Sequence, residues 1–313
     1  MDNTPLTIVI CTHNRANLLQ HTLVSIREAY RPPHCDLNVL VIANACKDRT
    51  IELLKTWQNV ADFPSLRYYE EPRPGKSLAL NLAIRKIDHG WLAFVDDDHR
   101  IDHDYLTAIV DAIHAWPEAT MFCGRILPDW RGDEPTWVHD TGPYRVYPLP
   151  IPCFELGETP FSVTKDDRIP GGGNLIVHRD VFRRVGEFST HLGPEGHNLR
   201  GGEDSDLVLR ALHQGETLQY VPSIVQYHHI DTQRLKLPYL LKKSFQRSFS
   251  ITLARHPHSR SIPPYLLRKL LHHLVQLTVS FDFMKFRFHL MRIAGTLGEM
   301  TGMITALNRA PEA

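Results

Sequence analysis

The stretch Trp91-Leu-Ala-Phe-Val-Asp-Asp-Asp98 joins an apolar run directly to three consecutive carboxylates. A short apolar run bounded by polar residues is typical of a strand that is buried on both faces of a parallel sheet. Three similar runs precede it, at Leu6–Cys11, Leu37–Ile42 and Ser65–Tyr69. Segments with helical spacing alternate with these runs, at residues 17–30, 50–57, 76–87 and 105–115. This β-α-β-α order predicts an α/β fold with a mostly parallel sheet and helices on both faces.

Polar clusters follow three of the predicted strands. Thr12-His-Asn-Arg15 follows the first strand, Ala43-Asn44 the second and Asp96-Asp-Asp98 the fourth. Ligands of open α/β sheets bind beyond the carboxyl ends of the strands. We therefore expect these clusters to converge on one crevice.

The later chain changes character twice. Residues 128–170 are rich in Pro, Gly and aromatic residues, which predicts a long irregular segment over the site. Strand and helix patterns resume at residue 171 and continue to about residue 221, and after Asp231 the pattern is helical. The sequence thus predicts a catalytic domain over residues 1–233 and a helical extension over residues 234–313.

Charge is unevenly distributed along the chain. The whole chain has no formal net charge, but the part from Arg234 to the C-terminus carries 13 Lys and Arg against 3 Asp and Glu. The residues before it carry 22 Lys and Arg against 32 Asp and Glu. This asymmetry indicates an acidic catalytic body and a basic extension with a partner of its own.

The cysteines and the N-terminus indicate a cytoplasmic location. The five cysteines are widely spaced without a C-x-x-C pair, as expected of reduced thiols rather than a zinc site. The N-terminus has no basic stretch followed by an apolar run, and no apolar run is long enough to span a bilayer.

The carboxylates of Asp96-Asp-Asp98 are candidates for a metal site. Adjacent carboxylates repel one another, and a divalent cation such as Mg²⁺ or Mn²⁺ relieves that repulsion while it holds a diphosphate. A solvated turn or a helix N-cap is the alternative.

Two other clusters are candidates for the chemistry. Gly202-Glu-Asp-Ser-Asp206 opens a predicted helix, whose dipole keeps a carboxylate ionised and suited to act as a general base. Simple capping is the alternative for this cluster. Tyr227-His-His229 offers an imidazole for a metal or a phosphate.

Glycine-rich segments supply backbone groups to the same chemistry. Arg73-Pro-Gly-Lys76 offers N–H groups and a cation to an anion, and Gly171-Gly-Gly173 permits a close backbone approach or a flexible turn. The chain has no P-loop, no G-x-G-x-x-G, no G-x-S-x-G and no H-E-x-x-H.

Taken in order, these segments resemble the inverting family 2 glycosyltransferases of the GT-A fold, over about residues 5 to 230. The elements that carry the resemblance are Ile8–Arg15, Asn44–Asp48 with Cys46 in place of the usual serine, Gly75–Asn81, Phe94–Asp98, Gly172–Asn174, Gly202–Asp206, and Val221-Pro222 with His228. The resemblance implies sugar transfer from a nucleoside-diphosphate sugar, with a UDP-sugar favoured, to a glycan or lipid-linked acceptor.

The resemblance also implies roles for single residues. Nucleotide-sugar binding would involve Thr12, Asn14, Arg15, Asn44, Asp48, Lys76, Asn81, Asp96 and Asp97. Asp98 and His228 would hold Mn²⁺ or Mg²⁺. Asp204 would be the catalytic base with support from Glu203, and the acceptor side would comprise Gly172, Gly173 and Asn174.

Other functions remain as alternatives. A nucleotidyltransferase or a pyrophosphohydrolase would share the crevice and the metal, and a non-catalytic scaffold would share the fold alone. In the extension, leucines at helical spacing from Leu266 to Leu274 and phenylalanines from Phe281 to Phe288 lie beside basic residues. This pattern is typical of an interfacial helix drawn to the inner face of a membrane, or of a stripe that packs on the core or a second subunit. No nucleic-acid-binding motif accompanies it.

Overall fold

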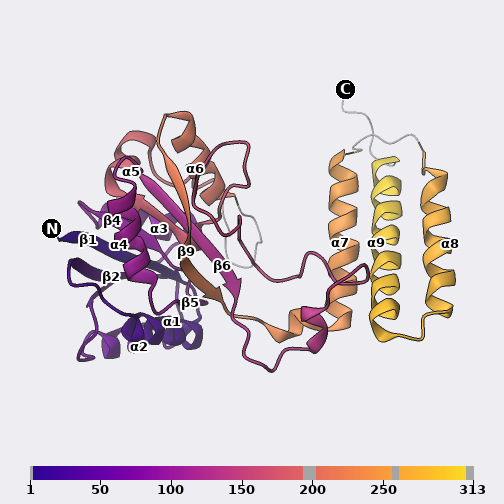
Figure 1. Cartoon of the computed structure of the whole chain (residues 1–313), viewed down its shortest axis with the longest axis horizontal. Helices are drawn as coiled ribbons and strands as arrows, with labels where there is room; N and C mark the ends of the chain where they lie inside the picture. Colours follow the sequence, from indigo (N-terminus) through magenta and orange to yellow (C-terminus); the bar gives the residue numbers. More distant parts are fainter. Residues whose placement is uncertain (1–2, 193–201, 256–260, 308–313) are drawn as a thin grey trace. The chain divides into compact units, whose positions relative to one another are not determined.

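The computed structural model describes residues 3–192, 202–255 and 261–307. The chain forms two compact units (Figure 1). The sheet unit comprises residues 1–129 and 152–229, and the helical unit comprises residues 130–151 and 230–313. The division into functional domains at residue 233 stays a prediction.

A sheet of nine strands forms the centre of the sheet unit. Its order is β3-β2-β1-β4-β8-β6-β9-β5, with β7 paired to β9 outside this path. The strands are β1 (Thr4–Thr12), β2 (Cys35–Asn44), β3 (Ser65–Glu71), β4 (Trp91–Phe94), β5 (His99–Ile101), β6 (Met121–Pro128), β7 (Phe161–Val163), β8 (Leu175–His178) and β9 (Leu218–His228).

The first half of this sheet is parallel and the second half is mixed. Strands β1 to β4 pair in parallel, as expected. Strand β8 runs antiparallel to both β4 and β6. A parallel neighbour requires a crossover, usually a helix, and the described chain between β6 and β8 contains no α-helix.

Helices cover both faces of the sheet. They are α1 (Ala16–Glu28), α2 (Thr50–Trp57), α3 (Lys76–Arg85), α4 (Tyr105–Ala115), α5 (Arg179–Val185) and α6 (Glu203–His213). Along β1, Ile8 and Ile10 pack with α1, α2 and α4, whereas Val9 packs with α3, α5 and α6. Because successive side chains of a strand point to opposite faces, this alternation builds one core on each side. The predicted α/β fold is confirmed.

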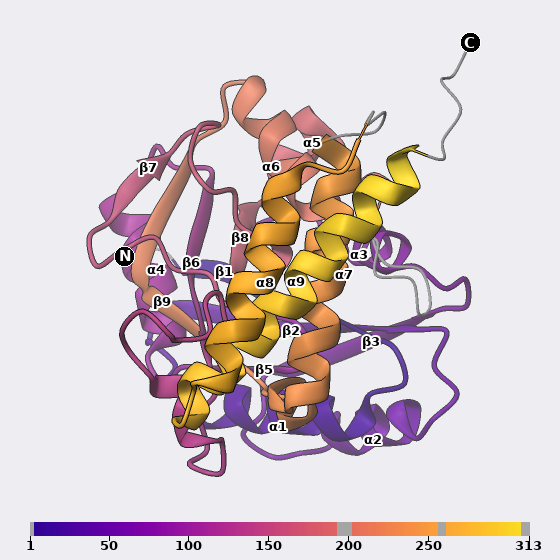
Figure 2. The same cartoon turned by 90° about the vertical axis from the view of Figure 1, so that its right-hand side faces the viewer.

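Three helices form most of the helical unit. They are α7 (Leu237–Arg255), α8 (Pro264–Thr278) and α9 (Phe283–Leu307), with α9 between the other two (Figures 1 and 2). A Cβ added at Gly298 would lie 2.2 Å from the carbonyl oxygen of Phe245, so glycine allows α9 and α7 to pack closely. Among the described residues, no helix has the length and apolar character needed to cross a bilayer.

The segment expected to be irregular divides between the units. Residues 152–170 belong to the sheet unit and include β7, whereas residues 130–151 group with the helices. The Arg287 guanidinium, 1% exposed, pairs with Asp140 at 3.0 Å and stacks 4.3 Å above the Trp137 ring. These long-range contacts explain why 130–151 leaves the sheet, which local composition does not indicate.

Candidate active site

The carboxyl ends of β1, β2 and β4 meet at a pocket of about 290 Å³. Its lining comprises Cys11, Thr12, His13, Arg15, Asn44, Gly75, Lys76, Asp96, Asp97, Asp98 and His228. The expected convergence of the three polar clusters is therefore confirmed, and its cause is the common direction of the three strands. No residue of 128–170 lines this pocket.

Lys76 connects the acidic turn after β4 to the acidic start of α6. Its Nζ lies 3.1 Å from Oδ1 of Asp96 and 3.9 Å from Oδ2 of Asp204. Burial alone would lower the pKa of Lys76, but the charges of Asp96 and Asp204 outweigh it and raise that pKa well above its usual value. Burial would likewise raise the pKa of Asp96, but the Lys76 ammonium outweighs it and holds that pKa below its usual range. An ammonium thus stands between two separate acidic groups.

The turn at Gly172 and Gly173 runs directly against the same two carboxylates. A Cβ added at Gly172 would lie 2.3 Å from Oδ1 of Asp204, and one added at Gly173 would lie 2.9 Å from Oδ2 of Asp96. Real Cβ atoms essentially never come within 3.0 Å of other heavy atoms. The two glycines therefore let the backbone approach both carboxylates, which face a common space.

The first turn of α6 contains three carboxylates in different environments. Glu203 is 2% exposed, and burial followed by the charge of Asp204 raises its pKa. Oε2 of Glu203 and Oδ1 of Asp204 are buried without a hydrogen-bond partner among the described residues. Asp206 instead accepts from Nε of Arg210 at 2.9 Å, as an (i, i+4) ion pair. Asp204 is therefore the carboxylate of this turn that lies beside Lys76, which lines the pocket, and its buried Oδ1 has no hydrogen-bond partner among the described residues.

Arg15 is bound by the other two aspartates of the acidic turn. Its Nη1 lies 3.0 Å from Oδ1 of Asp97 and 3.0 Å from Oδ2 of Asp98. Asp97 is 5% exposed, and its burial outweighs the Arg15 charge and raises its pKa to about 6. The hydroxyl of Thr22 fixes the turn by donating to the backbone carbonyl of Asp97 at 3.1 Å.

Asp98, His99 and His228 offer a metal site. One ligand atom from each lies within 4.8 Å of the others. Nδ1 of His228 lies 2.6 Å from the carbonyl oxygen of His229, and Nδ1 of His99 lies 2.6 Å from Oε1 of Gln226. Since these oxygens accept, each Nδ1 carries the proton and each Nε2 keeps its lone pair. Outer hydrogen bonds of this kind usually orient metal-binding histidines, so the residues fit a divalent cation.

The side chain of Asn44 shapes the loop in front of α3. Its Nδ2 donates to the carbonyl oxygens of Glu71 and Arg73, at 3.2 and 2.7 Å, and its Oδ1 accepts from the N–H of Gly75 at 2.8 Å. Gly75 has φ +146°, a conformation that favours glycine. Both ends of the amide hold backbone, so Asn44 positions the loop that presents Lys76.

Asn14 and Asp48 lie outside the pocket lining and hold neighbouring loops. Oδ1 of Asn14 accepts from the N–H of Lys47 at 2.6 Å, and Oδ2 of Asp48 accepts from the N–H of Ala16 at 3.0 Å. These hydrogen bonds tie the loop after β1 to the loop after β2.

Asn81 and Asn174 are also outside the pocket lining, and both are buried in the core. Asn81 exchanges two hydrogen bonds of 2.9 Å with the backbone of Phe188. Asn174 is 1% exposed and donates to the carbonyl oxygens of Arg125 and Ile224. Their amides are used by the protein, so both asparagines support the site from beneath instead of facing it.

His99 and Gln226 are the site residues that the sequence did not reveal. His99 lies opposite His228 in the antiparallel pairing of β5 with β9. The available signal was its position directly after Asp98, but the pairing that brings it to His228 joins residues far apart in sequence. Gln226 is fully buried and orients His99 from below.

A mixed α/β sheet with an acidic turn at its strand ends is the GT-A architecture, and comparison with known proteins agrees. The model of the family described as glycosyl transferase family 2 matches residues 7–186. Because this match covers more than half of the chain, the chain belongs to glycosyl transferase family 2. It is a glycosyltransferase.

Two relatives and two solved structures give the comparison its detail. The chain is 22% identical over 250 residues to the glucosyl-dolichyl phosphate glucuronosyltransferase of Haloferax volcanii, covering 78% of this chain and 75% of that protein. It is 25% identical over 240 residues to the succinoglycan biosynthesis protein ExoM of Rhizobium meliloti, covering 76% and 71%.

Both solved structures share the fold over nearly the whole chain. The mannosyltransferase PcManGT of Pyrobaculum calidifontis, in complex with GDP-Man and Mn²⁺, has a TM-score of 0.54 at 19% identity and covers 97% of this chain and 73% of its own. Residues 1–349 of TarS from S. aureus, in complex with UDP-GlcNAc, have a TM-score of 0.54 at 14% identity and cover 97% and 91%.

Proposed function

We propose that the chain is a metal-dependent, inverting glycosyltransferase that moves a sugar from a nucleoside-diphosphate donor to a hydroxyl of a glycan or lipid-linked acceptor. The observation that carries this proposal is the position of Lys76, 3.1 Å from Asp96 and 3.9 Å from Asp204. A donor diphosphate near Asp96 and an acceptor hydroxyl near Asp204 would then be neighbours in one crevice.

The donor would be bound along the loops after β1 and β2. Base and ribose contacts are assigned to Thr12, Asn14, Arg15, Asn44 and Asp48. Of these, Asn14, Asn44 and Asp48 would act partly through the loops they hold. Lys76, Asp96 and Asp97 would complete the nucleotide-sugar site, with the Lys76 ammonium facing the phosphates. The named complexes of the structural neighbours hold GDP-Man and UDP-GlcNAc, which supports a nucleoside-diphosphate sugar as the donor class. A UDP-sugar is the donor to test first.

The cation would be Mn²⁺ or Mg²⁺, held by Asp98 and His228. Burial lowers the pKa of His228 and favours the neutral imidazole that a metal requires. When bound, the cation supplies neutralisation of the charge that develops on the departing diphosphate. Lys76 adds a fixed positive charge on the same side.

Asp204 would take the proton of the acceptor hydroxyl, which attacks the anomeric carbon on the face opposite the diphosphate. One displacement of this kind inverts the configuration. Glu203 would support Asp204 from the same helical turn; its burial and the charge of Asp204 raise the pKa of Glu203. Gly172 and Gly173 would form the acceptor side by letting the backbone lie directly against the carboxylates of Asp204 and Asp96, with Asn174 fixing their turn.

Asp204→Asn tests the base, and Asp206→Asn is the matched control on the same helical turn. We expect Asp204→Asn to lower kcat by about 10² to 10⁴, the usual share of general-base catalysis. Turnover is measured after a screen of nucleotide sugars with Mn²⁺. Near-normal turnover by Asp204→Asn removes that residue from the role, and release of a nucleoside monophosphate instead of a diphosphate contradicts sugar transfer.

We further propose that the helical unit associates with an anionic membrane surface on the cytoplasmic side, or with a second copy of the chain. The support is a set of exposed apolar side chains on α8, in the turn that follows it and at the start of α9: Leu267, Leu271, Leu274, Val275, Val279, Phe281 and Phe283. Positions 267, 271, 274 and 275 share one helix face, and the excess of basic residues in this part of the chain favours an anionic partner.

A further inference from the structure

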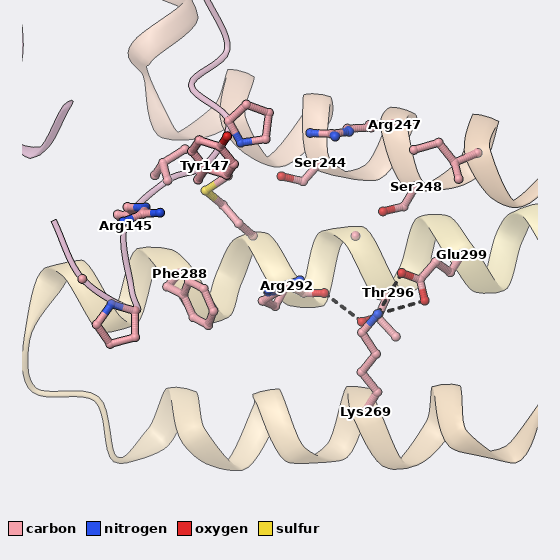
Figure 3. A pocket seen from close by; sticks show the side chains of 17 residues that line it. Arg145, Tyr147, Ser244, Arg247, Ser248, Lys269, Phe288, Arg292, Thr296 and Glu299 are labelled. Atoms are coloured by element: carbon pink, nitrogen blue, oxygen red, sulfur yellow. Dashed lines mark hydrogen bonds and ion pairs between the residues drawn. The ribbon is translucent and has the colours of Figure 1, made fainter. Parts of the chain in front are cut away.

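The helical unit contains a cavity of about 770 Å³, within the range of small-molecule sites. Helices α7, α8 and α9 and the loop of residues 142–148 line it, and it is open to solvent on one side (Figure 3). Small residues leave this space: a Cβ added at Gly295 would lie 3.2 Å from Oγ of Ser248, whereas one turn further on Gly298 is pressed against Phe245. Gly295 and Ser248 are thus small residues that both line the cavity, and a larger residue at 295 would enter it.

Three arginines line this cavity without a carboxylate partner. The structure records no ion pair for Arg145, Arg247 or Arg292 with any described residue. Arg247 comes from α7 and Arg292 from α9, and Arg145 belongs to the loop (Figure 3). The fourth cation, Lys269, is compensated, since its Nζ lies 2.8 and 3.0 Å from the two carboxylate oxygens of Glu299. The lining thus keeps three positive charges that are exposed and that have no carboxylate partner among the described residues.

The chemistry of these cations favours phosphate. A guanidinium presents a planar fork of N–H donors that matches phosphate oxygens, and it is less strongly hydrated than an ammonium. Ser244 and Ser248 add hydroxyl groups to the lining, beside Arg247 on the same helix.

An apolar groove continues from the cavity. This groove, of about 920 Å³, is lined by Leu149, Leu240, Phe245 and Phe249 among others. The cavity and the groove share Tyr147, Ser244 and Arg247 as lining residues, so they adjoin. A ligand that fills both has an anionic head and an apolar chain.

We propose that the helical unit binds an amphiphile whose phosphate lies among Arg145, Arg247 and Arg292 and whose apolar chain lies in the adjoining groove. This binding site goes beyond the proposed sugar transfer, and its test uses no donor sugar. Because the test uses a soluble, monomeric ligand, it distinguishes binding at this site from association of the helical unit with a membrane surface.

The full chain is titrated by calorimetry with three probes: phosphatidic acid with two six-carbon chains below its micelle concentration, the matching phosphatidylcholine, and inorganic phosphate. We expect phosphatidic acid to bind at least about tenfold more tightly than either other probe. The choline group of phosphatidylcholine covers its phosphate, and inorganic phosphate has no apolar chain. Equal affinity for inorganic phosphate overturns the role of the groove, and equal affinity for phosphatidylcholine overturns the role of the arginines.

The paired variants locate the site. Arg247→Gln with Arg292→Gln removes two exposed cations that line the hollow, and Lys242→Gln with Arg268→Gln removes two cations of the same bundle that are likewise exposed but line neither hollow. At about 1 kcal/mol per cation, the first pair should weaken binding by about 30-fold and the second by less than about threefold. Equal losses in both pairs, or no binding by the wild type, contradict the proposal. Unchanged circular dichroism confirms that both variants fold.

Discussion

Gly172→Ala introduces one methyl group directly against the proposed catalytic base. The added Cβ would lie 2.3 Å from Oδ1, 2.5 Å from Cγ and 2.8 Å from Oδ2 of Asp204. Gly171 provides the matched control, since a Cβ there meets nothing within 4 Å and its φ of −81° suits any residue. The two variants add the same methyl to neighbouring residues, and only one of them presses on Asp204.

The size of the effect follows from the overlap. Ordinary contact begins at 3.4 Å, so the carboxylate of Asp204 must retreat by about 1 Å to relieve a 2.3 Å contact. Displacing a reacting group by about 1 Å costs on the order of 10² in rate. We therefore expect kcat to fall by about 10² in Gly172→Ala and by less than about threefold in Gly171→Ala.

Steady-state turnover with the best donor from the nucleotide-sugar screen measures this difference. The affinity for the nucleoside diphosphate should stay close to wild type, because Gly172 lies at the acceptor side of the proposed site. If Gly172→Ala turns over as fast as Gly171→Ala, Asp204 does not act from the position in which the structure holds it.

Three further perturbations address the other parts of the molecule. Because the pKa of Asp97 is raised from 3.8 to about 6, its ionisation makes the folded state less stable as pH rises between these values. The free energy of unfolding of Asp97→Asn should therefore exceed that of the metal-free wild type at pH 7 by at most about 3 kcal/mol, and the two should differ little near pH 4. Denaturant unfolding measures both values, and the same difference at both pH values contradicts this prediction. His99→Ala should weaken Mn²⁺ binding, as measured by electron paramagnetic resonance. Gln226→Leu should weaken it by about 10- to 100-fold, because the His99 ring loses the hydrogen bond that orients it. Unchanged Mn²⁺ affinity in both variants excludes His99 from the metal site. The double variant Leu271→Ser with Leu274→Ser should sediment less with anionic vesicles than the wild type does. If vesicle binding is unchanged and only the molar mass of the protein in light scattering falls, self-association of the helical unit is favoured instead.

Local patterns were enough to predict the part of the fold that forms the pocket. The first four strands are short apolar runs between helices, and parallel strands bring their carboxyl ends to one edge. The positions of Asn44, Lys76 and Asp96 on that edge follow from sequence order alone.

Features that depend on distant pairing were not predicted. The pairing register of strand β6 with β9 shifts at Gly124, where a Cβ would lie 1.9 Å from the carbonyl oxygen of Ile224, so the path of β6 depends on its contact with β9. His99 reaches His228 only through the register of β5 and β9. A polar side chain next to a glycine run, such as Asn174, has the same local sequence whether it faces a ligand or the core.

Anomalous scattering from crystals grown with Mn²⁺ and UDP is the most direct test that the acidic turn holds a metal and a diphosphate beside the base. We expect one strong peak at coordination distance from Asp98 and from Nε2 of His228, with diphosphate density between that peak and Lys76. Bound UDP with the manganese peak elsewhere, or a diphosphate on the far side of the sheet from Asp204, would contradict metal-dependent sugar transfer in this crevice.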